Sequence, residues 1–145
     1  MDEFIKFLDK DLKYLKHKIV DNIIYIYIES TRSEVQCPFC GHMSSQVHST
    51  YERSFQDLPM QGKKVIIIIQ NRNMLCNNPD CDHTTFAERF IWLFYKAKKT
   101  QRLEDEIVRL SVNCSSIAAA RFLNKNTVAV GKSTICNLLK KKKNL

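Results

Sequence analysis

The sequence predicts an α+β fold, with a small antiparallel sheet in the first two thirds of the chain and three short helices after it. Between residues 20 and 90, β-branched and aromatic residues form runs of strand length. From Thr100 onward, apolar residues recur at the spacing of three and four that is typical of helices. We therefore predict two domains, residues 1–95 with the sheet and residues 96–145 with the helices.

An amphipathic helix is predicted at the amino terminus. Its apolar residues follow one another at spacings of four, four and three, which places them on one helical face: Phe4, Leu8, Leu12 and Leu15. The chain has no apolar run long enough to span a bilayer and no export signal. We therefore expect a cytoplasmic protein without a membrane partner.

Three strands are predicted next. Residues 23–29 are β-branched and aromatic, residues 47–55 alternate between apolar and polar, and residues 65–69 form an unbroken apolar run. A turn containing residues 57–59 and Gly62 separates the last two strands. The expected result is a small antiparallel sheet with cysteines at its edges.

Three helices are predicted in the last third of the chain. The first begins after Thr100, which we predict to be its N-cap. The second covers about residues 115–123, the third covers residues 133–142, and residues 124–130 form the loop between them. Two apolar stripes supply the predicted core: Leu103, Ile107 and Leu110 in the first helix, and Ile135, Leu138 and Leu139 in the third.

Four of the six cysteines form two closely spaced pairs. Cys37 and Cys40 are a C-x2-C pair followed by Gly41, and Cys76 and Cys81 are a C-x4-C pair further along the chain. Two such knuckles can place four thiolates at the corners of a tetrahedron, the geometry of a structural zinc site. We therefore predict one structural Zn²⁺ bound by these cysteines in a zinc-ribbon-like sheet.

Other uses of these residues stay open. Because the second pair is longer than usual, His83 is an alternative ligand to Cys81, and His42 is a weaker candidate of the same kind. The C-P-F-C sequence also occurs in thiol oxidoreductases, although such a site requires the second cysteine to continue into a helix. Cys114 and Cys136 are predicted to be buried in the helical part.

Positive charge is concentrated in the last third of the chain. Residues 1–95 contain 11 lysines and arginines against 12 acids, whereas residues 96–145 contain 12 against 3. Three short helices with a basic third helix are typical of a helix-turn-helix, whose last helix enters the major groove of DNA. We therefore predict double-stranded DNA as the partner, with a plain helical bundle and a solvated basic tail as the alternatives.

Ten residues are predicted to contact DNA. The start of the third helix is expected to reach base edges, and basic residues elsewhere are expected to bind phosphates. The set is Lys96, Lys98, Lys99, Arg102, Lys132, Ser133, Thr134, Asn137, Lys140 and Lys141.

The chain contains, in order, CPFCG, VHSTYERSFQDLP, VIIIIQNRNMLC, CNNPDC and TTFAERF, followed by the helical segment SSIAAARFLNKNTVAVGKSTICNLLKK. This order resembles the amino-terminal region of insertion-sequence transposases of the ISL-three family. The resemblance covers about residues 20–95 closely and the helical segment with weaker specificity. It implies a zinc finger and a helix-turn-helix that recognise terminal inverted repeats, with zinc ligands at Cys37, Cys40, Cys76 and Cys81.

Members of that family continue into a large domain with an Asp-Asp-Glu metal site for strand transfer. Strand transfer requires carboxylates that hold divalent metals, and the acids of the last third are grouped at residues 104–106. We therefore expect a truncated, nucleoid-associated transposase without catalytic activity or a small-molecule substrate, which forms a homodimer or binds the full-length transposase. A transcriptional regulator and a protein-interaction module are the alternatives.

Overall fold

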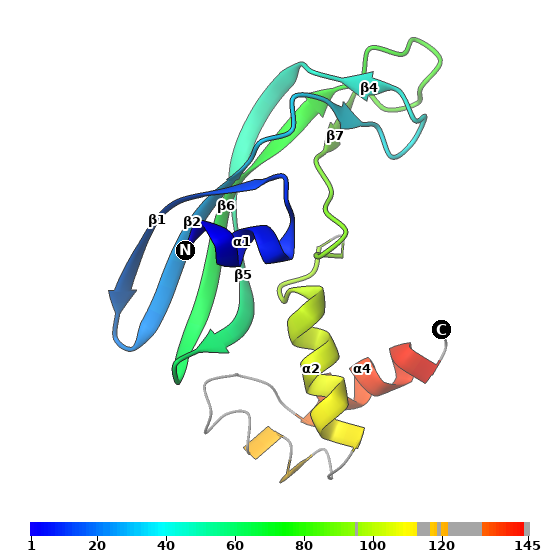
Figure 1. The fold of residues 1–145 in the computed structure, drawn as a ribbon. Coiled ribbons are helices and arrows are strands. Elements are labelled where there is room, and N and C mark those ends of the chain that lie inside the picture. The colour runs from blue at the N-terminus through cyan, green and yellow to red at the C-terminus, as the bar shows by residue number, and fades with distance from the viewer. Residues whose placement is uncertain (95, 113–116, 119, 122–131, 144–145) are drawn as a thin grey trace.

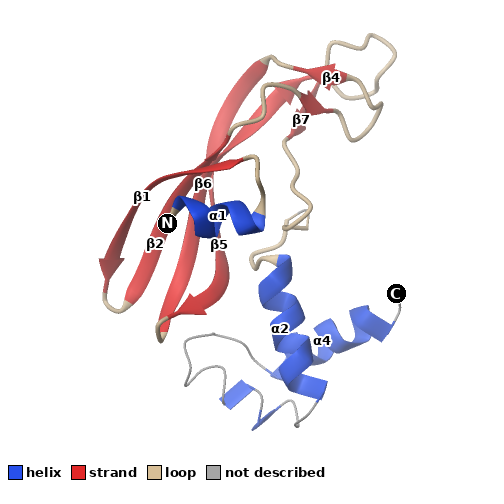
Figure 2. Ribbon diagram, in the orientation of Figure 1, coloured by secondary structure: helices blue, strands red, loops and turns tan. Residues whose placement is uncertain are grey.

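Five strands form one twisted sheet in the computed structural model, which describes residues 1–94, 96–112, 117–118, 120–121 and 132–143. The strand order is β1-β2-β6-β5, and β7 pairs with the end of β6 (Figure 1). The strands are β1 (Leu12–Val20), β2 (Ile23–Ser30), β5 (Val47–Met60), β6 (Lys63–Leu75) and β7 (Thr85–Ala87). The predicted α+β class is confirmed, since helices lie on and beside this sheet (Figure 2).

The sheet is mixed, so the prediction of an antiparallel sheet is wrong. β1 pairs with β2 and β5 pairs with β6 in antiparallel hairpins, but β2 and β6 run parallel, with Ile26 opposite Ile67. The two most apolar strands therefore lie side by side at the centre of the sheet. The connection from β2 to β6 runs through the cysteine knuckle and β5, and it is long enough for a parallel crossover.

Both hairpins have two-residue turns in which each central residue has a positive φ. Asp21 and Asn22 have φ of 51° and 65°, and Gln61 and Gly62 have 50° and 73°. Positive φ at both positions matches the right-handed twist of the flanking strands. Residues 57–59 lie in β5 and not in the predicted turn, and the pairing of β5 with β6 is irregular between Asp57 and Met60.

The amino-terminal helix α1 (Asp2–Leu8) is shorter than predicted, because Leu12 begins β1. The chain becomes extended at Asp9, whose carboxylate accepts a hydrogen bond from the Asp11 N–H at 2.9 Å. The buried face of α1 is also different from the predicted one: Ile5 is 2% exposed, whereas Phe4 is 57% exposed.

The main core lies on the sheet face that α1 covers (Figure 1). The segment after β7 contributes to the same core. Its buried members are Ile5, Leu12, Ile24, Ile26, Ile28, Phe55, Val65, Ile67, Ile69, Phe90, Trp92 and Leu93.

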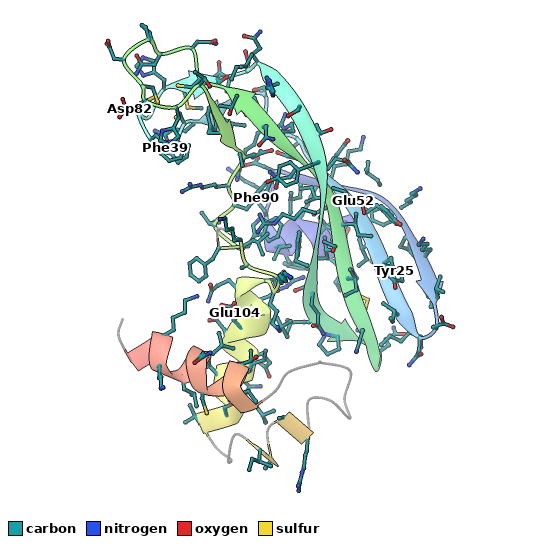
Figure 3. All side chains as sticks on the ribbon, turned by 180° about the vertical axis from the view of Figure 1, so that it is seen from behind. Tyr25, Phe39, Glu52, Asp82, Phe90 and Glu104 are labelled. Carbon is teal, nitrogen blue, oxygen red and sulfur yellow. The ribbon has the colours of Figure 1, made fainter. Side chains whose placement is uncertain are left out.

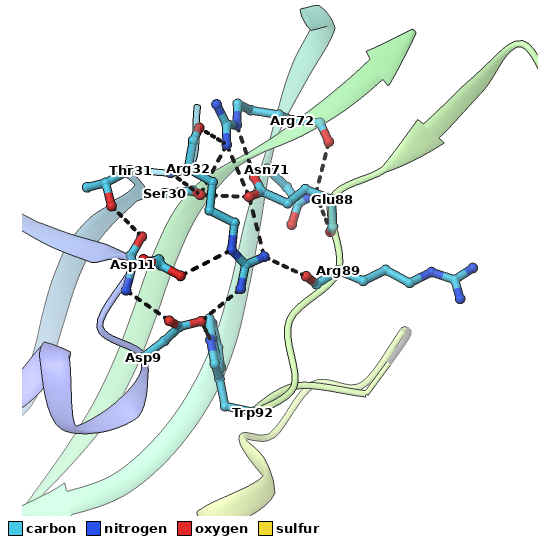
Figure 4. Close-up of polar contacts among 10 residues, drawn as sticks. All are labelled: Asp9, Asp11, Ser30, Thr31, Arg32, Asn71, Arg72, Glu88, Arg89 and Trp92. Carbon is cyan, nitrogen blue, oxygen red and sulfur yellow. Dashed lines mark hydrogen bonds and ion pairs between the residues drawn. The ribbon is translucent and has the colours of Figure 1, made fainter. Parts of the chain in front are cut away.

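A buried ionic network joins the end of the sheet to the segment after β7 (Figure 4). Glu88 is 1% exposed and accepts hydrogen bonds from Arg72 Nε at 3.0 Å and Ser30 Oγ at 2.6 Å. Arg32 lies between Glu88 and Asp9, and Asp9 also accepts a bond from the Trp92 indole at 3.1 Å. Residues from β2, β6 and three connecting segments are thereby held together.

Two helices, α2 (Gln101–Val112) and α4 (Lys132–Lys143), pack together beside the sheet. The prediction that Thr100 caps the first helix is confirmed, since its hydroxyl accepts the Leu103 N–H at 3.3 Å. Leu103, Ile107, Ala120 and Ile135 form a second core, against which Leu58, Leu110, Leu138 and Leu139 pack.

The predicted second helix is described only at residues 117–118 and 120–121, which are helical. The predicted loop at 124–130 and Cys114 lie outside the described residues, and Cys136 on α4 is half-buried. Of the helices that the structure describes, none has the length and apolarity needed to cross a bilayer.

Candidate metal centre

The first knuckle is a tight turn between two short strands, β3 (Val35–Gln36) and β4 (Met43–Ser44). The Gly41 N–H donates to the Cys37 carbonyl at 2.9 Å, and the Cys37 N–H donates to the His42 carbonyl at 2.8 Å. Gly41 has a φ of +82°, which only glycine adopts at low cost. The glycine therefore lets the chain fold back after Cys40 so that both sulfurs face one point.

The second knuckle connects β6 to β7. Its first cysteine, Cys76, comes directly after β6, and its N–H donates to the Thr84 carbonyl at 2.9 Å. The Cys81 N–H donates to the Asn78 carbonyl at 3.1 Å. These bonds close the second knuckle, and the pairing of β7 with β6 fixes its two ends.

The two knuckles bring four sulfurs together. The Sγ atoms of Cys37, Cys40, Cys76 and Cys81 all lie within 4.8 Å of one another, and the Sγ atoms of Cys40 and Cys76 are 3.5 Å apart. Tetrahedral zinc with Zn–S bonds of about 2.3 Å places its sulfurs roughly 3.8 Å apart. The donor set and its spacing therefore fit one zinc ion.

Apolar side chains pack against the sulfurs. Val35, Met74 and Phe86 are buried against the cysteines, and Cys37 itself is 1% exposed. Ser44, also buried, donates its hydroxyl proton to the Leu75 carbonyl and ties the first knuckle to the end of β6. Cys40, Cys76 and Cys81 are half-buried, so these side chains cover only part of the cluster. A set of four cysteines is nevertheless typical of a structural rather than a catalytic zinc site.

The alternative readings of the cysteine region find little support in this geometry. Neither His83 nor His42 belongs to the sulfur cluster; His83 instead stacks on Phe39, with ring centroids 3.6 Å apart and an interplanar angle of 6°. Cys40 is followed by Gly41 and a short strand, whereas a C-x2-C redox site continues into a helix. Among the described cysteines none forms a disulfide.

The thiols differ in acidity before metal binds. The His42 backbone N–H and the Asn78 side chain donate to Cys40 Sγ and lower the pKa of that thiol to about 6. At Cys76 the Asn78 backbone N–H lowers the pKa, but desolvation and the neighbouring sulfurs outweigh it and raise the pKa to about 12. The pKa of Cys81 is also raised, although the His83 backbone N–H acts in the opposite direction.

These values predict that zinc affinity rises with pH. At neutral pH Cys40 is mostly a thiolate, whereas Cys76 and Cys81 must release protons before they can bind zinc. Below about pH 6 Cys40 is protonated too, so about one more proton competes with each zinc ion. Competition titration against a chromophoric chelator over a range of pH would show the steeper dependence; a pH-independent affinity would contradict the assignment of thiolate ligands.

The predicted DNA contacts before α2 have different surroundings. Lys96 and Lys98 are exposed and Lys99 is half-buried. Arg102 instead forms an ion pair with Asp57, a carboxylate that is 3% exposed and also accepts the Thr100 hydroxyl at 2.7 Å. We therefore assign Arg102 to the attachment of α2 to β5. The sequence alone does not reveal this role, because Asp57 lies 45 residues before Arg102.

The predicted contacts on α4 lie along one helix. Asn137 and Lys140 are exposed, Thr134 is half-buried, and the side chains of Lys132 and Ser133 lie outside the described part of the structure. The Lys141 Nζ is 3.6 Å from a Glu104 carboxylate oxygen and 4.0 Å from the centroid of the Phe94 ring. Lys141 therefore also holds α4 against α2.

Comparison with known proteins places the sulfur cluster in a family. The family described as the zinc-finger of transposase IS204/IS1001/IS1096/IS1165 matches residues 33–81, which include all four cysteines. The transposase for insertion sequence element IS1001 of Bordetella parapertussis is 31% identical over 97 residues, which are 67% of this chain. The chain spans 23% of the length of that curated relative. No solved structure matches the chain.

The family match and the geometry agree on the same residues. Residues 33–81 form both knuckles and the strands between them, and the four sulfurs that converge are those that the spacing predicts. The predicted zinc cofactor is thus supported by the ribbon and by its donor set. Its zinc ribbon places the chain in the ISL-three family of insertion-sequence transposases, as the order of its motifs predicts.

Proposed function

We propose that this protein binds DNA in a zinc-dependent manner and recognises the terminal inverted repeats of an insertion sequence. The observation that carries the proposal is a transposase-type zinc ribbon with four converging cysteines, followed by a strongly basic helical segment. In this role residues 1–95 are the zinc-binding domain and residues 96–145 the domain that reads DNA. Such a protein works in the cytoplasm, at the nucleoid.

The proposed contacts divide into two groups. Lys96, Lys98 and Lys99 precede α2 and would bind phosphates, which gives affinity without sequence preference. Side chains near the start of α4 would reach base edges in the major groove, as in other helix-turn-helix proteins. This second group consists of Lys132, Ser133, Thr134 and Asn137, with Lys140 and Lys141 beside it.

Selection from random duplexes by the zinc-loaded protein tests this proposal. Enrichment of an inverted repeat that matches the flanks of its own gene would establish the transposon-end role. Enrichment of a promoter sequence instead would indicate a transcriptional regulator. Stable zinc binding with no enriched sequence would contradict the proposal and favour a protein-interaction module, because zinc ribbons also serve that role.

Substitutions should separate the two groups of contacts. We expect Lys132→Ala with Asn137→Ala to cost about 1–3 kcal/mol on the selected duplex and to reduce its preference over a scrambled duplex. Lys98→Ala with Lys99→Ala should weaken both duplexes similarly and lower the salt dependence, because phosphate contacts do not read sequence. Fluorescence anisotropy at several salt concentrations measures both effects. Equal loss of preference in the two variants would contradict α4 as the recognition helix.

We expect DNA binding without strand transfer by this polypeptide. The three acids near the start of α2 already have partners: Glu104 pairs with Lys141, Glu106 pairs with Arg109, and Asp105 accepts a hydrogen bond from Gln101 at 2.9 Å. Strand transfer requires carboxylates free to hold divalent metal ions. Joining of labelled transposon ends by the purified chain in Mg²⁺ would overturn this expectation.

A second copy of this chain or the full-length transposase is the proposed protein partner.

A further inference from the structure

A groove of about 560 Å³ lies on the sheet face beside the sulfur cluster. Its floor includes Tyr51 and Arg53 of β5, together with residues of β6 and β7. Phe39 and His83 of the two knuckles form one side, and Arg89 and Lys96 of the segment that leads to α2 also line it. Figure 3 shows Phe39 at the knuckle end of the molecule and Phe90 on that segment.

The charge of the groove is of one sign. Arg53, Arg89 and Lys96 line it, and none of its described lining residues is acidic. The Arg53 guanidinium is held in place by hydrogen bonds to the carbonyls of Ala97 at 3.0 Å and Phe94 at 3.5 Å. A guanidinium that is already positioned loses less conformational entropy when it binds an anion. The groove therefore offers fixed positive charge to a polyanion.

Flat rings lie next to these cations. The Phe39 and His83 rings stack, and the Arg89 guanidinium carbon is 5.5 Å from the Phe39 ring centroid. Tyr51 is 41% exposed on the floor. Grooves that combine cations with exposed aromatic rings are how proteins hold nucleic-acid strands, because phosphates meet the cations and bases or sugars meet the rings. An acidic peptide would match the charge but would leave the rings unused.

We infer that this groove is a second DNA contact, which holds the phosphate backbone of a strand against Arg53, Arg89 and Lys96 while its sugars or bases lie on the rings. The inference rests on the proposed DNA-binding function and extends it to the zinc ribbon. Because Phe39 and His83 belong to different knuckles, the stacked pair depends on the convergence of the four sulfurs. Zinc would therefore support DNA binding by shaping this groove.

Two exposed residues allow a direct test in the zinc-loaded full chain. Arg89→Ala and Tyr51→Ala should weaken the selected duplex and a scrambled duplex by the same factor, and Arg89→Ala should lower the salt slope by about one. Lys18→Ala is the matched control, since it removes an exposed cation near the β1–β2 turn, at the other end of the sheet. Zinc content and circular dichroism confirm that each variant is folded. If Arg89→Ala binds DNA as Lys18→Ala does, the inference is overturned.

Photocrosslinking separates this inference from the proposed function. Duplex and single-stranded DNA carrying 5-iodouracil are irradiated with the wild-type protein, and the linked peptides are identified by mass spectrometry. We expect links to Phe39, Tyr51 or His83 with at least one of the two probes. Links confined to residues 98–102 and α4 would overturn the groove but leave the helix-turn-helix proposal intact. Failure of the protein to bind either DNA would overturn both.

Discussion

Replacing Cys37 by serine is expected to abolish stoichiometric zinc binding and to unfold the knuckle end of the protein. Structural zinc contributes on the order of 10–16 kcal/mol in small zinc modules, and removal of one thiolate breaks the tetrahedral set. The loss should be local, because the core around the sulfurs is separate from the main core under α1. Metal analysis together with hydrogen exchange measures both effects: protection should disappear in residues 33–46 and 76–86 and persist in β2 and β6.

Two further substitutions make this test specific. Cys136→Ser changes a half-buried cysteine of α4 that lies outside the sulfur cluster, and it should keep one zinc per chain. His83→Ala should also retain zinc, whereas Cys81→Ser should lose it, because the cysteine belongs to the cluster and the histidine stacks on Phe39. Retention of zinc by Cys81→Ser and its loss in His83→Ala would show that the histidine is the fourth ligand.

Replacing Glu88 by alanine is expected to destabilise the protein by about 3–5 kcal/mol, because it leaves the Arg72 guanidinium partly buried without its carboxylate. Ser30 loses its acceptor in the same step. In a chain of this size a loss of 1 kcal/mol lowers the melting temperature by roughly 2–4 °C, so a fall on the order of 10 °C should be seen in calorimetry.

Matched variants separate the ionic network from simple loss of a carboxylate. Glu52→Ala removes an exposed carboxylate of β5 and should change stability by less than about 0.5 kcal/mol. Glu88→Gln keeps the shape of the side chain but not its charge, so its loss of stability should lie between those of Glu52→Ala and Glu88→Ala. Equal melting temperatures for Glu88→Ala and Glu52→Ala would show that the network contributes nothing to stability.

Features that depend on neighbouring residues could be predicted from the sequence. The cysteine spacing, with Gly41 after Cys40, indicates both knuckles, and the geometry agrees with it. The cap at Thr100 and the apolar spacing after it predict where α2 begins, and α4 differs from its predicted limits by one residue at each end. The turn at Asp21 and Asn22 was missed, although an acid–amide pair between two β-branched runs is a hairpin signal.

Features that depend on residues far apart in the chain could not be predicted in this way. The parallel register of β2 and β6 is selected by packing between two hairpins, and neither strand alone indicates its direction relative to the other. The end of α1 depends on Asp9, which Arg32 and Trp92 hold through contacts that span up to 83 residues. In the sequence Arg102 cannot be distinguished from the exposed basic residues near it, because its ion-pair partner Asp57 is brought beside it only by the fold.

The attachment of α2 to β5 has a consequence for the geometry of a bound DNA site. The backbone of Gln56 forms hydrogen bonds with the backbone of Lys98 and Thr100, and the Asp57 carboxylate binds both Thr100 and Arg102. β5 therefore fixes the start of α2 in position relative to the knuckle end. A rigid connection keeps the two proposed DNA contacts at a constant distance and angle. A flexible linker would instead let each contact adjust its position independently. Because duplex DNA repeats every 10–10.5 base pairs, we expect the two proposed contacts, if both are made, to be sensitive to helical phase. Half a turn inserted between the two parts of a DNA site would rotate one of them to the far side of the duplex and should weaken binding.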